Sequence, residues 1–220
     1  MSEYIYDMNR RFEYENGFYA TGDPSRFSKF ITHLEFFKQT SHIRGEILEF
    51  GVFKGNSFFR WIKFRDLLEH KMSRKIIGFD IFGNFPEANF DEDKAKRDAF
   101  VEETQGGKSI SLEEITSLLH EQKLDQNVEI IKGDILITLD TYLAENPHLK
   151  ISLLHIDVDL YEPTKHVLEK LFNRVSKGGI IIFDDYGAFA GTNKVVDDFF
   201  ENNREIKKLS FSNAISYIIK

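Results

Sequence analysis

Short apolar runs alternate with longer amphipathic stretches along most of the chain, and this alternation predicts strands and helices in turn. The runs short enough for buried strands lie at 46–50, 75–80, 128–132, 151–157 and 179–184. Helices are expected at 24–39, 55–70, 111–123, 134–146, 162–175 and 192–203. Apolar strands that alternate with helices indicate a parallel sheet covered on both faces.

The two ends of the chain depart from this alternation. Residues 1–22 are polar and aromatic without a clear period, which predicts an arm that packs onto the domain or onto a second subunit. Asp23 followed by Pro24 is typical of a helix start. Residues 205–220 predict a two-stranded hairpin around Ser212 and Asn213.

These elements together predict an α/β fold: a Rossmann-like, doubly wound, mostly parallel seven-stranded sheet with a C-terminal antiparallel hairpin. We expect this domain over residues 41–220, after an N-terminal arm and helix over 1–40 that forms a cap or a dimer contact. The stretch 81–110 is too long for an ordinary connection, and such insertions are usually functional loops. It is expected to be lid-like; a surface helix with flexible flanks is the alternative.

Composition excludes several classes of protein. The chain has no cysteine, so disulfides, thiolate zinc sites and a cysteine nucleophile are excluded. Its net charge of −7, without a basic stripe, argues against a nucleic-acid partner. No apolar run approaches the length of a membrane helix, and the N-terminus lacks the features of a signal peptide. We therefore expect a cytoplasmic protein without a membrane partner.

Residues after the first three predicted strands suggest a cofactor site, because doubly wound sheets bind ligands beyond the carboxyl ends of their strands. Glu49, Gly51 and Gly55 follow the methyltransferase spacing acidic-x-Gly-x-x-x-Gly, not the dinucleotide spacing G-x-G-x-x-G. Gly51 allows a tight turn, and Gly55 lets the next helix start close to a ligand. Glu49 is placed to meet a positively charged amino-acid moiety. Phe53 stands where many methyltransferases have another glycine.

Two further carboxylates complete this pattern. Asp80 ends the second strand and could accept both ribose hydroxyls, while Asp134, after Gly133, could accept from an adenine amino group. Helix or turn capping is the alternative reading of each, and one residue can do both.

Four more carboxylates, Asp157, Asp159, Asp184 and Asp185, follow the fourth and fifth strands in HIDVDLYEPT and IIIFDDYG. They would repel one another strongly if the two loops are adjacent, and no Lys or Arg lies within either motif before Lys165. A divalent cation would remove the conflict, and hard oxygen ligands suit Mg²⁺, with Mn²⁺ or Ca²⁺ as alternatives. Capping of the following helices is the competing explanation.

The chain resembles the macrocin O-methyltransferase family over about residues 40–220, most specifically in LEFGVFKGNS, GFDIFGNFPE, HIDVDLYEPT and IIFDDYG. It resembles catechol O-methyltransferase more distantly. The resemblance implies a metal-dependent O-methyltransferase that uses S-adenosylmethionine on a sugar hydroxyl. It also implies that Asp157, Asp184 and Asp185 bind the metal and that Asp159 is the base; Leu160 stands where the catechol enzymes have a lysine base. The residues expected to hold S-adenosylmethionine are Glu49, Gly51, Val52, Phe53, Gly55, Asn56, Ser57, Asp80, Gly133, Asp134 and Asp157.

Other functions stay open at this point. The acceptor could be a catechol-like hydroxyl instead of a sugar, and the fold could serve a non-catalytic binding protein. A Rossmann dehydrogenase is disfavoured by the missing G-x-G-x-x-G. The expected partners are a small-molecule or glycan acceptor and, as a candidate, a second copy of the chain. His155 alternates with Asp157 but lies deeper in the strand, so it is interpreted as a core residue in preference to a base.

Overall fold

Six strands form one sheet in the computed structural model, which describes residues 5–201, 205–212 and 214–220. The strands are β1 (Glu46–Phe50), β2 (Ile76–Asp80), β3 (Val128–Lys132), β4 (Ile151–Ile156), β5 (Val175–Phe183) and β6 (Ser216–Ile219). Their order is β3-β2-β1-β4-β5-β6. The first five are parallel and β6 is antiparallel to β5, which confirms the doubly wound, mostly parallel α/β fold.

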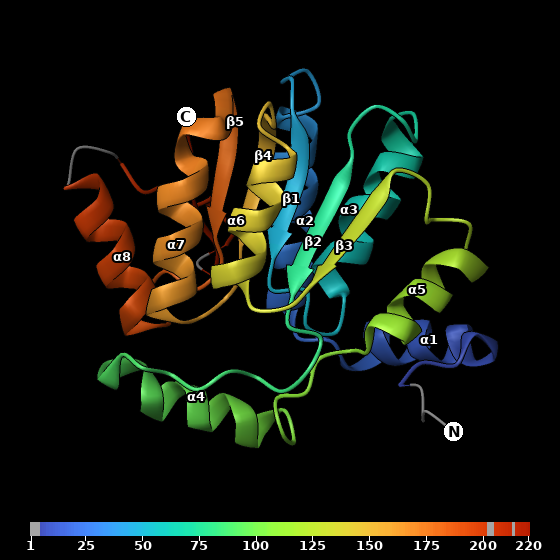
Figure 1. Cartoon of the computed structure of the whole chain (residues 1–220). Coiled ribbons are helices and arrows are strands. Elements are labelled where there is room, and N and C mark those ends of the chain that lie inside the picture. The colour runs from blue at the N-terminus through green and yellow to red at the C-terminus, as the bar shows by residue number, and fades with distance from the viewer. Residues whose placement is uncertain (1–4, 202–204, 213) are drawn as a thin grey trace.

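Helices cover both faces of this sheet, with α6, α7 and α8 on one face and α2 and α3 on the other (Figure 1). The α-helices are α1 (Arg11–Thr21), α2 (Pro24–Gln39), α3 (Asn56–Leu68), α4 (Asp91–Glu103), α5 (Leu112–Glu121), α6 (Ile135–Glu145), α7 (Tyr161–Leu171) and α8 (Ala190–Phe200). Short 3₁₀ helices occupy Met8–Arg10 and Phe172–Arg174. None of the helices in the described part of the chain has the length and apolar content that crossing a membrane requires.

The core divides into two clusters because successive side chains of a strand point to opposite faces. In β5, Ile181 and Phe183 join the cluster under α6, α7 and α8, whereas Ile180 and Ile182 join the one under α2 and α3. All four side chains are at most 1% exposed. Both faces of the strand are therefore buried, which explains its continuous apolar run.

The predicted number of strands was wrong by one. Residues 205–210 do not form a seventh strand; they contribute a single antiparallel bridge, Lys207 to Tyr217, beside β6. The chain then turns, since the Ser212 N–H donates to the Leu209 carbonyl at 3.1 Å, and the described residues of this segment form no second pair. Asn213, at the tip of the predicted hairpin, lies outside the described residues, as do the first four residues of the predicted arm.

The insertion 81–110 carries helix α4, which lies beyond the carboxyl edge of the sheet (Figure 1). The buried residue of this helix is Asp93. Its two carboxylate oxygens accept the backbone N–H groups of Tyr161, at 3.0 Å, and Gly191, at 2.8 Å, at the starts of α7 and α8. A Cβ added at Gly191 would lie 2.1 Å from Asp93 Oδ2, so this close approach requires glycine. Asp93 thus anchors the insertion to the domain.

Replacing Asp93 with Ala is expected to lower the free energy of unfolding by about 2–4 kcal/mol, because two hydrogen bonds to a buried charged group are lost. Urea denaturation measures this change. Asp91→Ala is the matched control in the same helical turn, since Asp91 is exposed and pairs with Lys94. Equal stabilities of the two variants would show that the anchor contributes nothing.

Candidate functional site

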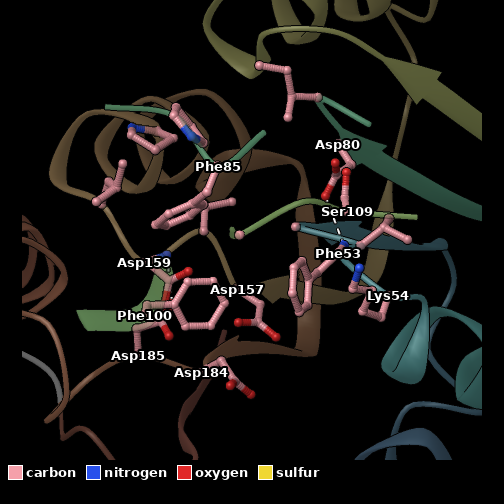
Figure 2. A pocket seen from close by; sticks show the side chains of 18 of the residues that line it. Phe53, Lys54, Asp80, Phe85, Phe100, Ser109, Asp157, Asp159, Asp184 and Asp185 are labelled. Atoms are coloured by element: carbon pink, nitrogen blue, oxygen red, sulfur yellow. Dashed lines mark hydrogen bonds between the residues drawn. The ribbon is translucent and has the colours of Figure 1, made fainter. Parts of the chain in front are cut away.

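A cavity of about 910 Å³ opens at the carboxyl edge of the sheet. Its walls come from the turns that follow β1 to β5, from the starts of α2 and α3, and from the insertion, whose Phe85, Phe100 and Ser109 face the carboxylates in Figure 2. Phe18 of α1 also lines it. The two groups of residues that the sequence predicted separately, after β1–β3 and after β4–β5, thus line one space.

The turn after β1 packs directly against the end of β4. Gly51 has φ +90°, and a Cβ added there would lie 1.7 Å from the Asp157 carbonyl oxygen, so only glycine fits. Gly55, also at positive φ, is the N-cap of α3, where the exposed Asn56 and the buried Ser57 both line the cavity. Val52 is buried but still contributes to the wall.

Asp80 holds the two loops that border the cavity. Its Oδ2 accepts the Phe53 N–H at 2.9 Å (Figure 2), and its Oδ1 accepts the Phe82 N–H at 2.6 Å. Phe53 and Phe82 both have positive φ, at 49° and 47°. The Asp80 carboxylate therefore stabilises two turns in a backbone conformation that residues other than glycine rarely adopt.

Gly133 and Asp134 lie on the cavity wall after β3. Asp134 Oδ1 accepts the Leu136 N–H at 2.9 Å and so caps α6, as the capping alternative predicts. The Gly133 N–H donates to the Asp80 carbonyl at 2.9 Å, which ties this turn to the neighbouring strand.

Glu49 lies beneath the cavity instead of on its wall, and it is fully buried. Ser57 Oγ donates to its Oε1 at 2.8 Å, and His155 Nδ1 lies 3.4 Å from its Oε2. The expectation that Glu49 meets the amino group of a ligand stays a prediction, and in this arrangement the contact requires a path past Ser57.

His155 is a core residue, as expected, and it links the two halves of the site. It is fully buried, and its Nε2 lies 3.4 Å from Asp184 Oδ1 and 3.9 Å from Asp157 Oδ2. Burial by itself lowers the pKa of His155, but Asp184 and Glu49 outweigh it and raise the pKa to about 10. The His155 ring therefore lies between Glu49 and the aspartates.

The predicted aspartates come together. Asp157, Asp184 and Asp185 each offer a carboxylate oxygen, and these oxygens lie within 4.8 Å of one another. Asp159, with φ +62°, donates its N–H to Asp185 Oδ2 at 2.9 Å. Burial, followed by the charge of a neighbouring carboxylate, raises the pKa values of Asp157 and Asp185 well above their usual range. The same two causes raise the pKa of Asp159 to about 7, so the site disfavours negative charge on all of these carboxylates at once.

A lysine that the sequence motifs did not indicate lies in this cluster. Lys29, on α2, bonds with its ammonium group to Asp184 Oδ2 and lies 3.9 Å from Asp157 Oδ2. Burial alone lowers the pKa of Lys29, but the two aspartates raise it above its ordinary value. In turn, burial alone raises the pKa of Asp184, but Lys29 and His155 lower it far below the usual range. The fold thus supplies from α2 the cation that the two motifs lack.

Arg60, one turn into α3, is a second cation that sequence reasoning missed. Its Nη1 lies 2.9 Å from His33 Nδ1, and its side chain lines the cavity beside the turn after β1. No carboxylate among the described residues lies within 4.0 Å of this guanidinium. Burial lowers the pKa of Arg60. A half-buried guanidinium without a carboxylate partner is a candidate group for an anionic part of a ligand.

Comparison with known proteins gives a consistent family match. The family model described as Macrocin-O-methyltransferase (TylF) matches residues 21–212. The 8-demethyl-8-(2,3-dimethoxy-alpha-L-rhamnosyl)-tetracenomycin-C 4'-O-methyltransferase of Streptomyces olivaceus is 30% identical over 159 residues, which are 70% of this chain and 58% of that protein. The demethyldecarbamoylnovobiocin O-methyltransferase of Streptomyces niveus is 28% identical over 162 residues, 72% of this chain and 59% of that protein. The chain therefore spans less than two thirds of the length of these curated relatives.

Among solved structures, the calicheamicin methyltransferase CalS11 has the same fold, with a TM-score of 0.74 at 24% identity, over 99% of this chain and 87% of that one. The family match also begins earlier than the sequence resemblance suggested, at residue 21 instead of about 40. It therefore includes α2, the helix that carries Lys29 into the cavity.

Proposed function

The chain belongs to the macrocin O-methyltransferase (TylF) family, and from this premise we propose that it transfers a methyl group from S-adenosylmethionine to a sugar hydroxyl. The observation that carries the proposal is that one cavity joins the turns after β1–β3 to the aspartates after β4 and β5. Both curated relatives are named as O-methyltransferases, and the name of the first includes a rhamnosyl group, which supports a sugar in the acceptor. A nucleotide-linked sugar or a glycan would present the same hydroxyl chemistry.

The residues around the first half of the cavity fit S-adenosylmethionine, which supplies an electrophilic methyl group on a sulfonium. Asp80 accepts one backbone N–H on each carboxylate oxygen, which leaves lone pairs free for ribose hydroxyls. Asp134 borders the same wall and is the proposed acceptor for the adenine amino group. Arg60 lies next to the turn Gly51–Ser57 and is the proposed partner of the carboxylate in the methionine portion of S-adenosylmethionine.

The aspartate cluster fits a divalent metal, because its donors are carboxylate oxygens gathered within 4.8 Å and two of the three pKa values are raised. Asp157, Asp184 and Asp185 would hold the ion. When bound, it lowers the pKa of the acceptor hydroxyl and stabilises the charge that develops on its oxygen. Mg²⁺ is the proposed ion, in keeping with the oxygen donors.

Asp159 is the proposed base. It lines the cavity between Asp157 and Leu160, and its backbone is fixed by the bond from its N–H to Asp185 and by the Thr192 hydroxyl, which donates to its carbonyl at 2.9 Å. Its carboxylate would take the proton of the acceptor hydroxyl as the methyl group is transferred. The aromatic residues of the insertion, Phe85 and Phe100, would exclude water from the reacting groups.

The deciding experiment measures methyl transfer from labelled S-adenosylmethionine to a panel of sugar nucleotides, glycans and glycosylated natural products, with catechols as the comparison. Transfer to a sugar acceptor supports the proposal, and transfer to catechols alone contradicts its sugar part. Thermal-shift assays with S-adenosylhomocysteine and with NAD separate a methyltransferase from a dehydrogenase. Cofactor binding without turnover on any acceptor would favour the non-catalytic binding protein.

Asp80→Asn is expected to weaken S-adenosylhomocysteine binding by about 1–3 kcal/mol, because a charged acceptor is lost and one of two backbone N–H groups loses its partner. Isothermal titration calorimetry measures the change. Asp66→Asn, on the far part of α3 and outside the cavity, is the control. An unchanged dissociation constant in Asp80→Asn would remove Asp80 from the cofactor site.

The insertion 81–110 is proposed to act as a lid, so its hydrogen exchange is expected to slow when cofactor and acceptor bind. The slowing should concentrate in the flanks of α4, because Asp93 already anchors the start of that helix in the free protein. Mass-spectrometric hydrogen exchange on free and ligand-bound protein tests this. Equal protection in both states would make the segment a fixed part of the cavity wall.

A further inference from the structure

Helix α2 directs two charged or polar side chains at the aspartate cluster from one face. Lys29 and His33 are four residues apart, so they lie on the same side of the helix. His33 is fully buried, stacks on Trp61 with ring centroids 4.5 Å apart, and lies edge-on to His155 at 5.0 Å. The second half of α2 is thereby fixed against the core. Lys29 extends from this fixed helix into the cavity.

Both carboxylate oxygens of Asp184 already have a nitrogen donor beside them. Oδ2 accepts from the Lys29 ammonium, and Oδ1 lies 3.4 Å from His155 Nε2. Asp157, the next proposed ligand, has the same ammonium 3.9 Å from its Oδ2. A divalent ion held by Asp157 and Asp184 would therefore approach the position of a positive charge, and the two charges repel strongly at such distances.

The two partners of this ion pair differ in their freedom to move. Asp184 follows directly from β5, and its backbone N–H is bonded to the Ile156 carbonyl at 3.0 Å. Lys29 has a long flexible side chain that is 22% exposed, so the ammonium can swing to solvent without movement of the helix. Of the two, Lys29 is the group that can leave.

We propose that Lys29 occupies the metal site in the metal-free protein and is displaced when a divalent cation binds. This inference rests on the proposed function, in which the three aspartates hold that cation. Lys29 is a positioning residue in this scheme, because it acts through Asp184 and Asp157. It balances their charge when no ion is bound, and the ion must overcome this contact, so metal affinity is lower than the aspartates alone would give.

The test is titration of the purified full-length protein with Mn²⁺, with free ion measured by electron paramagnetic resonance. K29M is expected to bind Mn²⁺ roughly tenfold to a hundredfold more tightly than the unmodified protein, because a charge-assisted bond no longer competes. K29R, which keeps the charge, should stay close to the unmodified protein. K38M removes the same charge from the exposed end of α2, where Lys38 pairs with Glu35, and controls for the change in net charge.

Equal or weaker Mn²⁺ binding by K29M overturns the inference, since a lysine with a purely structural role would loosen the site when lost. Absence of Mn²⁺ binding in every variant would also overturn the inference, and it would remove the metal from the proposed function as well. Equal Mn²⁺ binding by K29M and the unmodified protein would instead contradict only the competition between Lys29 and the ion. The two failures are therefore distinguishable.

A second measurement uses the unmodified protein, so it does not depend on the folding of a variant. Reductive methylation of lysines, quantified by peptide mass spectrometry, reports the accessibility of each ammonium group. Lys29 is expected to react several-fold faster with saturating Mg²⁺ than with chelator, while Lys38 reacts equally in both. A Lys29 reactivity that is unchanged or reduced by Mg²⁺ contradicts displacement.

Discussion

Asp185→Asn is expected to lower kcat on the order of a thousandfold or more, because the proposed metal contributes several kcal/mol to stabilisation of the transferring group. Asp185 is buried, and no Lys or Arg among the described residues lies within 4.0 Å of its carboxylate. Chelator should abolish activity of the unmodified enzyme in the same way, and Mg²⁺ should restore it. Steady-state methyl transfer with labelled cofactor measures both effects.

The metal-free stability of the two neighbouring variants should move in opposite directions. Burial, and then repulsion from Asp159 and Asp184, raise the pKa of Asp185. Asp185→Asn removes the buried carboxyl and this repulsion, so the metal-free protein should become more stable. Asp184→Asn leaves Lys29 and His155 without their carboxylate and should destabilise it. Asp198→Asn, at an exposed Asp of α8 that pairs with Lys194, is the control.

Full activity of Asp185→Asn in excess chelator would contradict the assignment of a metal to the aspartate cluster.

Asp159→Asn is expected to slow methyl transfer by about 10²–10⁴-fold, the usual contribution of a positioned general base. Asn tolerates the left-handed conformation that Asp159 adopts at φ +62°, and its N–H can still donate to Asp185. The loop should therefore keep its shape. Single-turnover kinetics isolate the chemical step from product release.

Binding measurements separate this effect from damage to the site. Affinities of Asp159→Asn for S-adenosylhomocysteine and for Mn²⁺ should stay near those of the unmodified protein. A single-turnover rate equal to that of the unmodified enzyme would show that another group takes the proton. Loss of both affinities together with the rate would show that Asp159 supports the structure of the loop instead.

The sequence alone determined most of the architecture, since strands β1 to β5 and most of the helices between them carry their own local signals, whereas α1 lies in the stretch 1–22 that shows no clear period. The apolar runs at β1, β2, β4 and the second half of β5 are buried on both faces, whereas the edge strand β3 is half-buried or exposed. The helices predicted between the strands lie close to their expected positions, so periodicity was sufficient for them. It also determined that Asp157, Asp184 and Asp185 would meet, because parallel strands end at the same edge of the sheet. The seventh strand failed because Lys207 alone pairs with β6 before the chain turns.

Only the tertiary structure decided which distant groups balance these charges. Lys29 is 155 residues from Asp184 along the chain, and Asp93 is 98 residues from Gly191. No local sequence motif could therefore indicate either contact. The sequence did not show the burial of Glu49 either: it lies beneath the cavity, where Ser57 Oγ donates to its Oε1. Local patterns report which face of an element is apolar, whereas the partner of a polar side chain depends on how whole elements pack.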